Sequence, residues 1–159
     1  MNYDITKLNN NIEKSILVDE IYSFTKESLK GTDLISLDNV KINGEIFKNS
    51  LGNIELDLSV EGIMILPCAV TLKPVEYPFS IEINGEFNDL MGENSTNFKN
   101  TIDILPIIWE NILMEIPMRV VSPDAEDITL EGDGWIYNSK EEDDNNPFKE
   151  LLNMNSEVK

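Results

Sequence analysis

Apolar and polar residues alternate with a period of two over much of the first half of the chain, a pattern typical of strands that bury one face. The alternation over residues 40–46 and 54–60, separated by Asn49-Ser50-Leu51-Gly52-Asn53, predicts a β-hairpin. An apolar run at residues 63–66 and a further alternating stretch at 79–87 predict additional strands. The short spacing between these segments indicates an antiparallel sheet.

The N-terminal segment has a weaker pattern. Residues 3–8 alternate weakly and are expected to form a strand that ends at Asn9-Asn10-Asn11, and residues 16–18 form a second short strand candidate. Residues 19–30 stay open between two interpretations. Their apolar spacing fits a helix loosely, and Asp19 is a candidate cap. The extended alternative is what the family resemblance described below implies.

One helix is expected from Asp103 to Glu115. Asp103 can accept hydrogen bonds from the first free N–H groups, and Pro106 falls in the first turn, where its missing N–H costs little. Pro117 ends the helix. The segment is apolar on more than one face, which favours packing across a sheet over exposure to solvent.

The remaining segments predict short elements and linkers. Residues 88–100 contain few apolar groups and are expected to form a loop. The others are a strand segment at 120–121, a turn at 131–134, a strand at 135–137, a charged linker at 140–146 and a short helix after Pro147. We expect one α+β domain over residues 1–139, built from an antiparallel sheet or a partly closed barrel that one main apolar helix covers. An acidic linker over 140–146 and a short C-terminal helix with a tail over 147–159 complete the chain.

Charge limits the possible partners. The chain has 159 residues, 12 basic and 30 acidic, for a formal net charge of −18. That charge repels phosphate backbones within a Debye length of about 8–10 Å, and the basic residues are scattered singly along the sequence. Nucleic-acid binders normally concentrate basic residues in a patch. Direct RNA contact by the free protein is therefore disfavoured, and a basic protein partner is favoured.

Cysteine content and hydropathy bear on the compartment. A single cysteine cannot form an internal disulfide, which is typical of a reducing compartment. The N-terminus has neither the basic nor the apolar region of a signal peptide. No apolar stretch approaches the length of about 18 residues that a membrane-spanning helix needs. We therefore expect a cytoplasmic protein.

The residues offer little for catalysis. Histidine is absent, which removes the commonest general base and metal ligand. Cys68 is a nucleophile only if its pKa is lowered, and Lys73 is the one nearby cation in the sequence, so a small buried apolar group is the simpler interpretation. No Gly-rich phosphate loop occurs, and we expect neither a cofactor nor a metal. An acidic cluster raises the alternative of a carboxylate-based, metal-dependent hydrolase or nuclease, although a solvated face explains it more simply. Its members are Asp124, Glu126, Asp127, Glu131 and Asp133.

The most distinctive stretch runs from Ile65 to Phe79. It contains Cys68 and three of the seven prolines, Pro67, Pro74 and Pro78. Because proline fixes its own φ and restricts the preceding residue, the stretch predicts a strand, a knuckle and a second strand.

This stretch resembles the Cys-x-x-[Cys/Thr]-Leu segment, followed by Tyr-Pro, of the YceD family of large-subunit ribosomal RNA accumulation proteins of bacteria and plastids. Other blocks extend the resemblance in the same order: Ile102-Asp103, Ile112 to Pro117, Ser122-Pro123-Asp124-Ala125, Gly134-Trp135 and Asn146-Pro147-Phe148. The Ser-Pro-Asp-Ala block is similar to the Gram-positive branch. Thr71 stands where other members carry a second cysteine, so their metal-like knuckle does not transfer to this chain.

The resemblance implies a bacterial protein, not an enzyme, that supports 23S ribosomal RNA accumulation and assembly of the large ribosomal subunit. With the charge argument it suggests protein–protein interaction with a ribosomal protein or an rRNA-processing factor. The candidate contact residues are those of the knuckle and one aromatic anchor: Pro67, Cys68, Leu72, Pro74, Tyr77 and Trp135. Two questions stay open. The knuckle is either a structural corner or a binding ridge. The alternative to a ribosome-related function is an acidic regulatory module unrelated to ribosomes.

Overall fold

The computed structural model describes residues 1–91, 100–125, 129–132 and 135–138. The chain divides into two compact units, Met1–Val120 and Val121–Lys159. The predicted linker at 140–146 and the C-terminal helix at 147–159 lie outside the described residues, so the proposed domain division stays a prediction.

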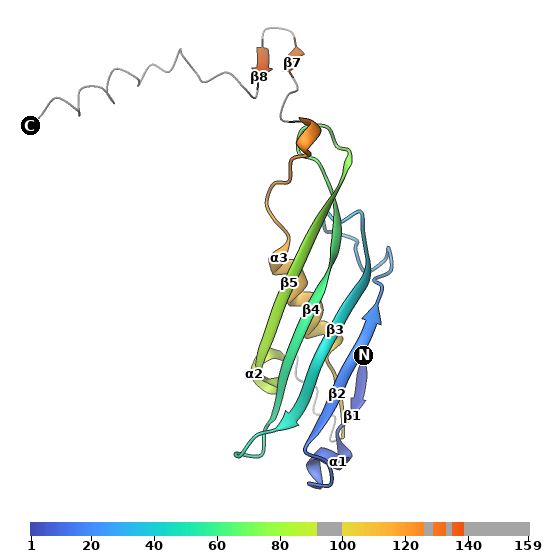
Figure 1. Ribbon diagram of the computed structural model, residues 1–159, viewed down its shortest axis with the longest axis vertical. Coiled ribbons are helices and arrows are strands. Elements are labelled where there is room, and N and C mark those ends of the chain that lie inside the picture. Colours follow the sequence, from blue (N-terminus) through green and yellow to red (C-terminus); the bar gives the residue numbers. More distant parts are fainter. Residues whose placement is uncertain (92–99, 126–128, 133–134, 139–159) are drawn as a thin grey trace, which may run out of the picture. The chain divides into compact units, whose positions relative to one another are not determined.

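A four-stranded antiparallel sheet forms the centre of the first unit (Figure 1). Its strands lie in chain order: β2 (Ser15–Tyr22), β3 (Ser36–Lys48), β4 (Ile54–Pro67) and β5 (Pro74–Glu86). The predicted hairpin is confirmed as β3 and β4, and the strand, knuckle and strand pattern as β4 and β5. The sheet is open, so the fold is α+β with an antiparallel sheet and not a barrel.

One face of this sheet carries the core. On β3 and β4, the residues predicted to share a face lie on the core side, and most are buried and pair across the strands, as in Ile42 with Val60 and Ile46 with Leu56. Register shifts between Asp38 and Lys41, where β3 carries one residue more than β4. Because the bulge consists of Asn39 and Val40, both Leu37 and Val40 are buried on the core face, although the odd spacing between them would place them on opposite faces of a regular strand.

Helix α3 (Leu105–Glu115) lies along the core face of the sheet (Figure 1). Ile107, Ile108 and Ile112 are buried, which confirms the expected packing across the sheet. The helix begins two residues later than predicted, because Asp103 ends the short strand β6 (Thr101–Asp103). Asp103 nevertheless accepts a hydrogen bond from the Leu105 N–H at 3.1 Å.

Aromatic residues anchor the same layer. The Trp109 ring packs against Phe24 with centroids 4.9 Å apart, and Trp109 borders the core. Residues 19–30 prove to be mixed. Their first four continue β2, and turns follow at 26–31, so neither the helix nor a fully extended segment describes the whole stretch.

Three short elements correct the predictions. Residues 3–8 are not one strand, because β1 (Asn2–Asp4) pairs with β6 and α1 (Thr6–Asn9) follows it. Asp4 accepts hydrogen bonds from the Thr6 N–H and hydroxyl, which turn the chain at that point. The start of the predicted loop at 88–100 is helical, since α2 spans Phe87–Met91. Residues 92–99 lie outside the described part.

The second unit contributes the 3-10 turn η2 (Pro123–Ala125) and a hairpin of β7 (Thr129–Gly132) and β8 (Trp135–Asn138). The expected aromatic strand at 135–137 is confirmed as β8. The expected strand at 120–121 is wrong, because neither residue belongs to a strand. Val120, at the end of the first unit, accepts a hydrogen bond from the Ala69 N–H at 2.8 Å.

Candidate functional site

The knuckle between β4 and β5 is a closed turn over residues 68–73. The Cys68 N–H donates to the Lys73 carbonyl at 2.8 Å, and the Leu72 N–H donates to the Cys68 carbonyl at 2.9 Å. The Thr71 N–H lies 3.4 Å from the Cys68 sulfur. These contacts, together with the bond from Ala69 to Val120, hold the turn against the segment that follows α3.

Cys68 is fully buried beneath the knuckle. A buried apolar environment does not favour the thiolate that nucleophiles and metal ligands require. Its position therefore agrees with a small packing residue, and the neighbouring Thr71 contributes a backbone N–H toward its sulfur.

Leu72 is the residue of the knuckle that its surroundings explain least. Its φ is +58°, in the left-handed region that a branched side chain rarely adopts, and its side chain is 76% exposed. This backbone conformation costs roughly 1 kcal/mol or more of folding free energy, and the exposed apolar side chain does not contribute to the core.

The other predicted contact residues divide between the two faces of the sheet. Pro67 and Pro74 pair in register on the solvent face, whereas Tyr77 pairs with Met64 on the core face and packs against the core. Trp135 belongs to β8 in the second unit, and its side chain lies outside the described residues. The structure thus places the first five candidates on one hairpin.

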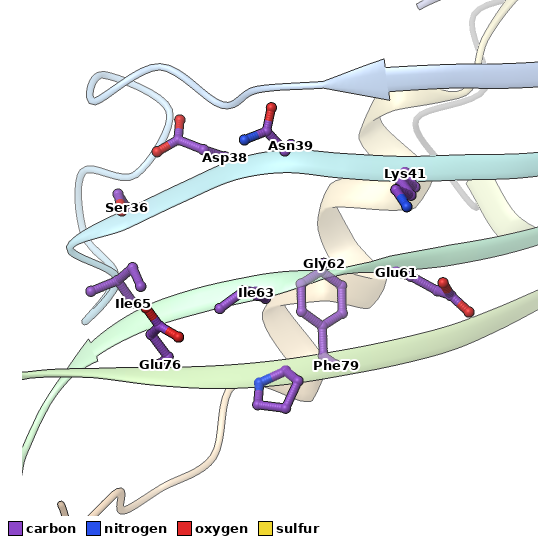
Figure 2. Close-up of a pocket in the computed structure, with 11 residues that line it drawn as sticks. Ser36, Asp38, Asn39, Lys41, Glu61, Gly62, Ile63, Ile65, Glu76 and Phe79 are labelled. Atoms are coloured by element: carbon purple, nitrogen blue, oxygen red, sulfur yellow. The ribbon is translucent and has the colours of Figure 1, made fainter.

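The solvent face of β3, β4 and β5 contains a hollow that was not predicted from the sequence. Its volume is about 600 Å³, and Ile63, Ile65 and Pro78 give it an apolar floor. Figure 2 shows Ile63 and Ile65 along β4, with Asp38 and Asn39 on one side and Glu76 on the other.

The β3 bulge and Gly62 shape this hollow. Gly62 stands opposite the bulge, and a Cβ atom there would lie 2.9 Å from the Phe79 ring, which fills that space from the core side. A glycine within a strand often marks a bulge or a close approach. Gly62 is therefore the signal by which the sequence could have indicated this region.

Acidic side chains dominate the solvent face. By register, nine carboxylates of the four strands lie opposite the core: Asp19, Asp38, Glu45, Glu55, Asp57, Glu61, Glu76, Glu82 and Glu86. Within these strands Lys41 is the single basic residue on that face. Salt bridges among the described residues join Met1 to Asp103 and Lys7 to Glu13, so none neutralises this face.

A separate contact lies at the sheet edge, away from the hollow. The Tyr3 hydroxyl donates to Glu20 at 2.7 Å. Burial raises the pKa of Tyr3 well above its ordinary value, and the hydrogen bond and negative charge of Glu20 raise it further. This contact ties β1 to β2.

The acidic cluster near 124–133 yields one described side chain. Asp124 lies in η2 and is exposed, whereas the side chains of the other four members lie outside the described residues. Among the described residues, no three Cys, Asp or Glu side chains form a group able to hold a metal ion.

Comparison with known proteins decides the family. The family described as "Large ribosomal RNA subunit accumulation protein YceD" matches residues 56–155. The chain belongs to the YceD family. It is also 29% identical over 154 residues to the "Uncharacterized protein YlbN" of Bacillus subtilis (strain 168), a match that covers 91% of this chain and 89% of that protein. No solved structure matches the chain.

The YceD match begins within β4 and includes the knuckle, β5 and α3. It therefore contains most of the hollow, while the β3 side comes from residues before the match. The likeness to the Bacillus protein extends over nearly the whole chain, so it includes the β3 side of the hollow as well as the side formed by β4 and β5. In the described residues, no helix has the length and apolar character needed to cross a bilayer.

Proposed function

We propose that this YceD-family protein supports accumulation of 23S ribosomal RNA, and hence large-subunit assembly, by binding a basic protein and without catalysing a reaction. Membership of a family described by large ribosomal RNA subunit accumulation carries the proposal. The partner would be a ribosomal protein or an rRNA-processing factor. Such proteins must be basic to bind RNA, and they are the natural counterpart of an acidic surface.

Electrostatics supports a protein partner over naked RNA. A surface with nine carboxylates and one lysine repels a phosphate backbone and attracts cationic segments. Acidic surfaces also steer basic partners and speed their encounter in a salt-dependent manner. The protein would then act on RNA level through the protein it binds.

The knuckle supplies a second line of support. Leu72 keeps a strained backbone and an exposed apolar side chain, a combination that favours a contact role over a structural one. Pro67 and Pro74 flank it and carry no N–H, so they add a stiff apolar surface to the same hairpin.

Depletion of the protein in its own host tests the function. We expect the ratio of large- to small-subunit ribosomal RNA to fall and to recover when the wild-type chain is restored. An unchanged ratio would refute the role in RNA accumulation.

A knuckle variant tests the contact. Leu72→Asn suits the left-handed backbone and removes the apolar side chain, so it should fold normally yet restore the ratio poorly. Tyr77 is unsuitable for this purpose, because it packs against the core. Met114→Ala removes another exposed apolar side chain, on α3, and serves as the matched control.

A further inference from the structure

The hollow combines an apolar floor with an acidic rim. Ile63 is 48% exposed there, so its side chain is available for contact. Asp38, Glu61 and Glu76 line the same hollow. One step further along the strands, Pro67 and Pro74 continue the apolar floor to the knuckle.

The form of the hollow favours a chain segment over a small molecule. Small-molecule sites are mostly apolar and fix their ligand with a few precisely placed polar groups. Here every charged side chain of the lining is exposed, and the floor runs along β4 from Ile63 toward Pro67. An extended peptide has that shape, with alternate side chains pointing toward and away from the surface.

Charge selects the kind of segment. Three rim carboxylates face one lysine, Lys41, and the acidic face continues beyond the hollow along β4 and β5 at Asp57 and Glu82. A cationic segment gains attraction along this whole path, whereas a phosphate backbone is repelled.

We propose that the hollow is the docking groove for an extended, basic segment of a partner protein, which places an apolar side chain on Ile63 and its lysines or arginines against Glu61 and Glu76. The groove runs from the centre of the sheet to the knuckle. This inference rests on the proposed function for the identity of the partner, but not for the binding chemistry.

Peptide binding to the full-length protein tests the groove. The probe is a fluorescein-labelled peptide, Lys-Leu-Lys-Ile-Lys-Leu-Lys, measured by fluorescence anisotropy at low and at physiological salt. A second peptide replaces its apolar residues by serine, and a uridine 20-mer tests RNA. We expect the apolar basic peptide to bind about five-fold more tightly than the serine peptide, and the RNA not to bind.

Charge reversal locates the binding. An exposed charge pair changes affinity about two-fold, and each reversal removes an attraction and adds a repulsion. Glu61→Lys with Glu76→Lys should therefore weaken the peptide about 16-fold, and Lys41→Glu should strengthen it about four-fold. Glu110→Lys with Glu115→Lys changes the net charge equally on α3, across the core, and should have little effect. Circular dichroism checks that each variant is folded.

Ile63→Ser tests the apolar floor independently. It should clearly reduce the preference for the apolar peptide and leave the affinity of the serine peptide unchanged. An undiminished preference would overturn the contact with Ile63. If the Glu61/Glu76 and Glu110/Glu115 double variants lost peptide affinity equally, the binding would depend only on net charge. That result would overturn the groove. Preferential binding of the uridine 20-mer would overturn the protein partner.

Complementation separates this inference from the proposed function. After depletion, the Glu61/Glu76 double variant should fail to restore the ribosomal RNA ratio, whereas the Glu110/Glu115 control should restore it. Full rescue by both variants would refute the role of the groove but not the proposed function. An unaffected ratio on depletion would refute the proposed function, and the peptide measurements would still test the groove.

Discussion

Gly44 occupies a position of the sheet where an added side chain would overlap the backbone of the neighbouring strand. It lies in the middle of β3, paired with Val18 of β2 and Leu58 of β4. Its φ is +147°, and a Cβ atom would lie 2.0 Å from the Asp57 carbonyl oxygen and 2.8 Å from the Leu58 Cα. Close C–H···O contacts are about 3.3–3.6 Å, so Gly44→Ala must push β3 and β4 apart.

The cost follows from two contributions. The strained backbone costs on the order of 1–3 kcal/mol. Separating the strands weakens the flanking ladder, and the loss of two backbone hydrogen bonds costs about 1 kcal/mol each. After subtraction of the gain from a stiffer unfolded chain, we expect Gly44→Ala to lower the free energy of unfolding by about 2–4 kcal/mol, a large part of the roughly 5–15 kcal/mol of a typical domain.

Gly85 provides a matched control. Its φ of +155° is nearly the same, but the nearest atoms to an added Cβ are those of the Leu90 side chain, at 3.5 Å and beyond. Gly85→Ala therefore carries the backbone strain without the overlap, and it should cost about 1–2 kcal/mol after the gain from a stiffer unfolded chain.

Urea unfolding followed by far-UV circular dichroism compares the two variants. With an m-value of about 2 kcal/mol/M, the expected difference of about 2 kcal/mol separates their midpoints by about 1 M. Midpoints that coincide, or a less stable Gly85→Ala, would refute the assignment of the cost to overlap with the Asp57 carbonyl.

Three further predictions concern other parts of the chain. Ile112→Ala, which opens a cavity under α3, should cost about 2–5 kcal/mol in urea unfolding, whereas the exposed Met114→Ala should change stability by less than about 0.5 kcal/mol. Tyr3→Phe should remove a phenol that ionises well above the ordinary pH of a tyrosine in an alkaline absorbance titration, because folding raises the pKa of Tyr3. The linked stability is present in full below the ordinary value of about 10 and is lost as the pH rises above it, so the destabilisation by Tyr3→Phe should shrink at high pH. Leu72→Asn should unfold at an equal or slightly higher urea concentration than the wild type, and a clear loss would show that Leu72 supports the fold.

The sequence predicted the elements that bury one face over a long stretch. Alternation over 40–60 identified the hairpin because a strand with one buried face repeats every two residues. Two prolines identified the ends of the knuckle for an equally local reason, since each restricts its own backbone. Helix α3 was found by its apolar content, although its start was placed two residues early.

Short elements and the groove depend on contacts that no local pattern records. Thr6–Asn9 is too short for a helical period, and the Val120-Val121 pair has strand propensity without a strand partner. The groove joins Asp38, Ile63 and Pro78 from three strands, and their proximity follows from the register and the bulge. Gly62 alone gave a local indication.

Because Cys68 is buried, the rate at which its thiol is alkylated reports how often the knuckle opens. A reagent that alkylates thiols can reach the sulfur only when the turn over residues 68–73 opens, and the chain has no other cysteine to react. The labelling rate in native conditions therefore measures how often this turn opens, separately from unfolding of the sheet. A segment bound along the groove as far as the knuckle would slow that rate, so one thiol reports occupancy without any label on the partner.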